Sequence, residues 1–157
     1  MSSPLTIPEE ATTTTAGDPT PGPSQFHLRR TGNQPLEFEG TLIAQAAGPQ
    51  INGRQRDRGH DIRVYRTVGG TYVVETVYWT TWAGEAEVRT ATPVGREASA
   101  VAAALRAHNP LDHVMGYPPA ERFRSKQERL FVRLREDFAT RVTDVLSALP
   151  DAVERIR

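Results

Sequence analysis

The sequence of 157 residues predicts an α+β domain, in which an antiparallel β-meander of about five strands is followed by a short Ala-rich helix and a long C-terminal amphipathic helix. Two patterns indicate this order. Residues 26–92 contain runs of β-branched and aromatic residues separated by glycine-containing turns. Residues 96–149 contain apolar residues at intervals of three and four, the period of a helix. A single domain is therefore expected over residues 26–149, followed by a short tail at residues 150–157.

Residues 1–25 differ in composition from the rest of the chain. They hold five prolines, six threonines and no aromatic residue, so they cannot bury enough apolar surface to offset the entropy of ordering. We expect a disordered arm here. Two interpretations stay open: a solvated leader without a role, or a docking peptide whose Leu5 and Ile7, in the segment "PLTIPEE", insert into a partner.

The first two strands are predicted in "FHLRRT", residues 26–31, and "LEFEGTLIA", residues 36–44. Gly32 and Asn33 between them suit a tight reversal of the chain. Gly40, in the middle of the second strand, indicates a bulge or the close approach of another element. Strict alternation places four apolar residues of this strand on one face: Leu36, Phe38, Leu42 and Ala44.

A second hairpin is predicted after a polar loop at residues 47–61. Its strands, residues 62–68 and 71–81, flank Gly69 and Gly70, and a last strand at residues 85–92 ends before Pro93. Glu85 and Glu87 lie two apart in that last strand, a spacing typical of a solvated edge.

The strand at residues 71–81 is apolar on both faces, so both faces need cover. We expect Val73, Val77 and Trp79 to pack under the helices. The opposite face would then carry Tyr72, Val74, Tyr78 and Trp82. Because two helices cover only one face, we expect a second subunit or a larger assembly to cover the other.

Two helices are predicted after the strands. Residues 96–108 are Ala-rich, which favours a helix that packs closely on a sheet, and Asn109-Pro110 ends it. A long helix should run from Pro119, a residue suited to a first helical position, to about Leu149. Its apolar stripe comprises Phe123, Leu130, Phe131, Leu134, Phe138, Val142, Val145, Leu146 and Leu149, and its basic face comprises Arg122, Arg124, Lys126, Arg129, Arg133 and Arg135.

The composition restricts the chemistry. There is no cysteine, hence no disulfide, thiolate nucleophile or Cys-based zinc site, and nowhere do 18 apolar residues follow one another as a membrane span requires. A soluble cytoplasmic protein is expected. Lysine plus arginine equal aspartate plus glutamate, 19 each, and the body of the chain has only a mild positive excess because the acidic residues of the arm have no basic counterpart.

The histidines are the first candidates for acid–base or metal chemistry. His108 and His113 flank Asp112, but their spacing of five spans a helix end rather than one helical face, so capping and turn roles are favoured over zinc. His60-Asp61 would need a nucleophile that the sequence does not indicate. We expect no enzyme, cofactor or metal site.

Nucleic-acid binding is the alternative to a protein-interaction role. Basic residues at Arg54, Arg56, Arg58, Arg63, Arg122, Arg124, Lys126 and Arg129 would neutralise phosphates, and strand aromatics would stack on unpaired bases. In the order of its elements, antiparallel strands followed by a helix, the chain over residues 26–149 resembles the Whirly and Pur-alpha type of single-stranded nucleic-acid binder. The resemblance involves no sequence motif. Against it, five glutamates share the predicted sheet.

The favoured function is a non-enzymatic interaction or assembly module that acts through an aromatic sheet face and the long helix. Its partner would be the protein itself, as a homo-oligomer, or another protein in a larger complex. The predicted interface residues are Leu5, Ile7, Tyr65, Tyr78, Trp82, Phe131, Leu134 and Phe138. No membrane partner is expected.

Overall fold

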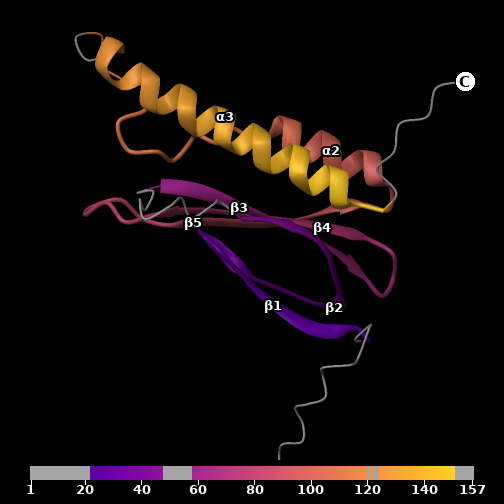
Figure 1. The fold of residues 1–157 in the computed structure, drawn as a ribbon. Coiled ribbons are helices and arrows are strands. Elements are labelled where there is room, and N and C mark those ends of the chain that lie inside the picture. Colours follow the sequence, from indigo (N-terminus) through magenta and orange to yellow (C-terminus); the bar gives the residue numbers. More distant parts are fainter. Residues whose placement is uncertain (1–21, 48–57, 120, 122–123, 151–157) are drawn as a thin grey trace, which may run out of the picture.

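A computed structural model of the chain describes residues 22–47, 58–119, 121 and 124–150, with the side chains of 124–126 excepted (Figure 1). Its strands are β1 (Ser24–Arg30), β2 (Asn33–Ala46), β3 (Arg58–Thr67), β4 (Tyr72–Thr80) and β5 (Val88–Gly95). Its helices are α2 (Ala98–Ala107) and α3 (Arg124–Ala148). The strands form one antiparallel sheet in the order β1-β2-β3-β4-β5, so the predicted α+β meander is confirmed.

The sheet curls until its two edge strands meet. Both helices lie on one side of β3, β4 and β5, and the β1–β2 hairpin bends away on the opposite side (Figure 1). Thr31, in the turn after β1, donates its backbone N–H to the carbonyl of Arg89 on β5 at 2.9 Å. In return, the backbone N–H of Arg89 donates to Oγ1 of Thr31 at 2.8 Å. The curl therefore encloses a second interior, separate from the helix-covered face.

Each interior has its own apolar core. The core under the helices contains Ile62, Val64, Tyr72, Val74, Val101, Leu105, Phe138, Val145 and Leu149. The core inside the curl contains Leu28, Tyr65, Val73 and Ala91, with Phe26, Leu36, Phe38 and Leu42 packed against it. Three rings meet there, since Phe26 and Phe38 lie 4.8 and 5.4 Å from Tyr65 between ring centroids.

Strand β4 separates the two cores, and its faces are the reverse of the predicted ones. Tyr72 and Val74 pack under the helices, and Tyr78 joins the cluster beneath the first half of α3, whereas Val73 lies inside the curl. The cover for the second face comes from the β1–β2 hairpin of the same chain. The expectation that a second subunit or a larger assembly covers this face is therefore wrong.

Gly40 and a neighbouring bulge allow the curl. A Cβ at Gly40 would lie 2.4 Å from the carbonyl oxygen of Arg66, so the predicted close approach is confirmed. The pairing of β2 with β3 shifts register between Leu42 and Ala44. Leu42 therefore packs inside the curl and Ala44 under the helices, and the prediction that the two share a face is wrong.

Several boundaries differ from the prediction. β3 begins at Arg58, four residues earlier than expected, because the end of the polar loop pairs with β4. β5 passes through Pro93, which pairs with Val73; proline is tolerated there because β5 is an edge strand. α3 is described from Arg124, and Pro119 lies outside it. The predicted arm, apart from residues 22–25, and the tail from residue 151 onward lie outside the described residues.

The predicted stripe of α3 is confirmed where its side chains are described. Phe131, Leu134, Phe138, Val145 and Leu149 are buried against the sheet or the loop before the helix. Within the described part of the chain, no helix has the length and apolar character needed to cross a membrane.

Candidate interaction surface

Trp82 is the predicted interface residue that the structure leaves at the surface. It follows β4, and 44% of its surface is exposed. The guanidinium carbon of Arg58 lies 4.1 Å from the centre of the Trp82 ring. Arg58 itself is only 5% exposed, so a buried cation supports one face of the indole.

Glu85 holds this arrangement in place. Its side chain is 2% exposed and accepts hydrogen bonds from Nε of Arg58 at 2.9 Å, from the Thr80 hydroxyl at 2.7 Å and from the backbone N–H of Met115 at 2.6 Å. Burial of the Glu85 carboxyl opposes its ionisation, but these hydrogen bonds and the charge of Arg58 outweigh burial and lower its pKa. The carboxylate therefore stays charged and joins the turn after β4 to the loop before α3.

Met115 is the second exposed apolar residue tied to Glu85. Its side chain is 45% exposed, while its backbone N–H is fixed by the glutamate. Nearby in the same loop, Leu111 and Val114 are buried against Phe131 and Leu134 of α3. The backbone N–H of Glu85 also donates to the carbonyl of Trp82 at 3.2 Å, so Glu85 links the backbones of Trp82 and Met115, which together we call the Trp82 surface.

His60 lies beneath the helices. It is 1% exposed, its Nε2 is 3.1 Å from the carbonyl oxygen of Pro110, and its ring packs on Tyr78 and Phe138. Burial, with a smaller contribution from the nearby His108, lowers the pKa of His60 to about 4. The imidazole is neutral near pH 7. The residues that the structure describes contain no group of three or more side chains suited to hold a metal ion.

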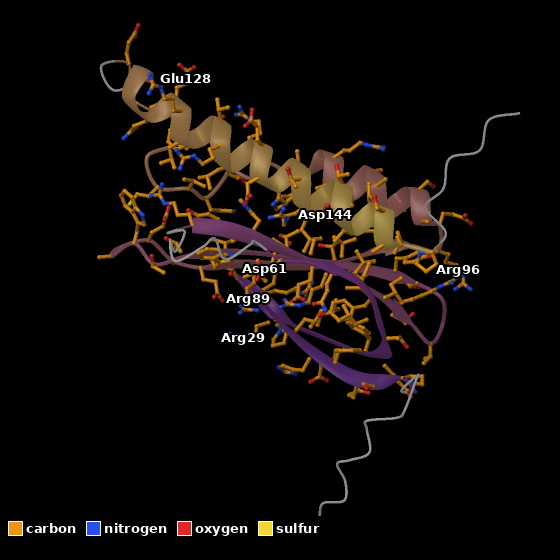
Figure 2. The ribbon with its side chains drawn as sticks, viewed as in Figure 1. Arg29, Asp61, Arg89, Arg96, Glu128 and Asp144 are labelled. Atoms are coloured by element: carbon orange, nitrogen blue, oxygen red, sulfur yellow. The ribbon has the colours of Figure 1, made fainter. Side chains whose placement is uncertain are left out.

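A second buried carboxylate lies inside the curl. Glu75, 3% exposed, accepts a hydrogen bond from the Tyr65 hydroxyl at 2.7 Å and lies 3.6 Å from Arg63 and 4.0 Å from Arg89. Figure 2 shows Arg89 and Asp61 on the sheet face that points away from the helices. Burial and the bond to Glu75 raise the pKa of the Tyr65 hydroxyl.

A groove of about 550 Å³ lies between the C-terminal end of α2 and the middle of α3. Its floor includes Leu105, Phe138 and Val142, and Arg106 and Arg135 lie at its border. His108 lines both this groove and a smaller cavity of about 240 Å³ between α2 and the sheet. The Ala-rich sequence of α2 explains the cavity, because Ala104 and Ala107 do not reach the strands below.

The structure brings together few of the predicted interface residues. Trp82 is exposed, but five others are buried: Tyr65, Tyr78, Phe131, Leu134 and Phe138 have exposed fractions of 4–5%. Their apolar surface serves the two cores and the cluster beneath the first half of α3, so these side chains are not offered to a protein partner in this fold. Leu5 and Ile7 lie outside the described residues.

The predicted phosphate-binding residues that the structure describes lie in different environments. Arg58 is buried on Glu85, Arg63 is paired with Glu75, and Arg129 is exposed on α3. Arg54, Arg56 and Arg122 lie outside the described residues, as do the side chains of Arg124 and Lys126. Tyr65 and Tyr78 are buried and one face of Trp82 lies on Arg58, so these three rings do not form one exposed surface.

Sequence reasoning missed Glu85 and Met115. Glu85 follows the pattern of an exposed edge, and its burial depends on a loop 30 residues further along the chain. One sequence feature could have indicated this site. Arg58, Trp82 and Glu85 lie close to the ends of β3 and β4, and antiparallel pairing of these strands brings the three residues to the same end of the sheet.

Comparison of the chain with family models, with curated proteins and with solved structures gave no match. The resemblance in element order to Whirly and Pur-alpha type proteins therefore has no support from a solved structure. The site alone carries the functional argument.

Proposed function

We propose that this protein is a non-enzymatic assembly module that associates with a second copy of itself through the Trp82 surface. The observation that carries the proposal is the indole of Trp82, exposed to solvent and supported from beneath by the buried Arg58–Glu85 pair. Tryptophan, with tyrosine and arginine, is enriched among the interface positions that dominate binding.

The energetics support an interface role for this arrangement. Burying an ion pair stabilises a fold little, because the desolvation of both charges offsets their attraction. Here the pair supports one exposed ring and fixes the backbone of one loop. A ring that is already oriented loses less entropy on association, so the supported Trp82 favours binding. The flexible side chain of Met115 adapts to the surface of a partner.

A second copy suits the chemistry of this surface. In a two-fold dimer the same patch faces itself, so Met115 of one protomer would pack on Trp82 of the other, twice. Thioether–aromatic contacts of this kind are favourable by roughly 0.3–1.5 kcal/mol each.

The test is the molar mass of the full chain by light scattering and sedimentation across a range of concentrations. We expect a monomer–dimer equilibrium that Trp82→Ala and Met115→Ala each shift toward monomer by about tenfold or more in the dissociation constant. Val68→Ala is the matched control, since Val68 is 63% exposed in the β3–β4 hairpin and outside the Trp82 surface. A chain that stays monomeric at high concentration would contradict the proposal.

A further inference from the structure

The groove between α2 and α3 has an apolar floor and no acidic residue in its lining. Leu105, Phe138 and Val142 supply the floor, and the ring of His108 lies 5.2 Å from that of Phe138. Burial lowers the pKa of His108, with His113 acting in the same direction against the attraction of Asp112, so the imidazole is neutral near pH 7. The charge in the groove comes from two arginines.

Those two arginines differ from three arginines of β3 and β5. Arg58, Arg63 and Arg89 are all paired with glutamates. Arg106 and Arg135, by contrast, form no ion pair with a residue that the structure describes. Two guanidinium groups at the border of an apolar groove provide fork-shaped donors that match a carboxylate.

We propose that this groove binds a small organic carboxylate with an apolar body. The body lies on Leu105, Phe138 and Val142, and the carboxylate accepts hydrogen bonds from Arg106 or Arg135 at the border. The inference goes beyond the proposed function, because neither Trp82 nor Met115 lines the groove.

The size of the groove favours a small molecule. Its volume of about 550 Å³ is within the range of small-molecule sites, which combine mostly apolar walls with a few placed polar groups. Its walls come from two helices packed on one sheet, so the site exists before the ligand arrives. A neutral ligand would leave the arginine donors unused, and a cation would be repelled by them.

The experiment is calorimetric titration of the full chain with decanoate below its micelle concentration, with decanol and decyltrimethylammonium as uncharged and cationic comparators. We expect saturable binding of decanoate and at least tenfold weaker binding of both comparators. Equal affinity for decanoate and decanol, or no binding of decanoate, would overturn the proposal.

Substitutions in the groove test whether the ligand binds there. Arg135→Gln should weaken decanoate about tenfold, and Ala139→Trp, at an exposed position that lines the groove, should block it. Arg133→Gln is the matched control, because Arg133 is exposed on α3 but outside the groove lining, and it should leave the affinity unchanged. Equal losses in Arg133→Gln and Arg135→Gln would assign binding to general surface charge and refute the site.

A competition titration separates a free carboxylate from an acidic segment of a protein. The synthetic peptide PLTIPEE, residues 4–10, carries apolar Leu5 and Ile7 beside Glu9 and Glu10. We expect decanoate to bind at lower concentration than this peptide. If the peptide displaces decanoate at a peptide concentration below that needed for decanoate to bind, the groove is a site for a protein segment, and the small-molecule proposal is wrong.

Discussion

Two buried glutamates, Glu75 and Glu85, have similar arginine partners but connect different parts of the fold. Each is 2–4% exposed at its side chain and each is bonded to arginine. The partners of Glu75 all belong to the sheet: Tyr65, Arg63 and Arg89. The charge of this carboxylate is therefore balanced within the sheet, by the two arginines. Glu85 instead joins a strand, a turn and a loop, and its arginine supports an exposed ring.

The contribution of a buried ion pair to stability depends on how exposed the arginine partner is and on which elements the pair joins. Arg63 and Arg89 retain side-chain exposures of 35% and 27%, so solvent can compensate for the loss of Glu75. The side chain of Arg58 is only 4% exposed, so Glu85 is needed to balance the charge of Arg58. Glu85 thereby also keeps Arg58 in the position that supports the ring of Trp82.

Removal of Glu85 should have the largest effect. We expect Glu85→Ala to lower the free energy of unfolding by about 3–5 kcal/mol, since it leaves the Arg58 guanidinium buried without a counter-charge. Urea denaturation measures the change. Glu87→Ala is the control: its side chain is 42% exposed, and the expected loss is below about 1 kcal/mol. Similar losses in the two variants would show that Arg58 does not need Glu85.

Acidification should come next, because it protonates His60, a buried group without a charged partner. Its pKa is about 4 in the folded state and 6.5 when unfolded, so between these values the unfolded chain binds more protons. The free energy of unfolding should therefore fall by about 3 kcal/mol as the pH falls from 6.5 to 4, and stay level above this window.

Unfolding at a series of pH values measures this slope. His60→Phe should remove most of it, leaving the part that His108 contributes in the same direction. The lowered pKa of Glu85 predicts a separate loss at more acidic pH, below the ordinary carboxyl value of 4.5. An unchanged slope in His60→Phe would assign the acid sensitivity to other groups.

Loss of charge at Glu75 should have a smaller effect than loss of Glu85. Glu75→Gln keeps an acceptor for the Tyr65 hydroxyl and removes only the attraction for Arg63 and Arg89, so we expect about 1–2 kcal/mol of destabilisation. Chemical denaturation checks the value. A cost equal to that of Glu85→Ala would remove the distinction between the two glutamates.

Truncation of Trp82 should have the smallest effect on stability. The expected loss for Trp82→Ala is at most about 1 kcal/mol, from the contact of its ring with Arg58. Thermal unfolding at a protein concentration low enough to exclude self-association gives the value. A much larger loss would mean that Trp82 serves the core rather than an interface.

Local patterns were sufficient for much of the fold. The spacing of Phe131, Leu134 and Phe138 predicted the buried stripe of α3, because the helical period places residues three and four apart on one face. Gly69-Gly70 predicted the hairpin, in which Gly70 has a φ of 94° that other residues rarely adopt. Both patterns are independent of the rest of the chain.

Other features were not accessible to such patterns. The alternation along β2 did not predict that Ala44 changes face, because the bulge arises from pairing with β3. Pro93 indicated the end of a strand, yet at a sheet edge its missing N–H costs nothing. For the candidate site, Trp82 was predicted from its residue type, whereas Glu85 was assigned to a solvated edge.

The sequence by itself determined the elements, their order and the apolar faces of the long helix, since these follow from periods and turn residues within short segments. Only the tertiary structure decided which face of β4 meets the helices, because both faces are apolar and local alternation is the same for either choice. It also decided that the chain covers the second face itself, through contacts such as Thr31 with Arg89, 58 residues apart. Long-range pairing determines which side chains remain exposed, and therefore leaves Trp82, Met115 and the two groove arginines as the surfaces to test.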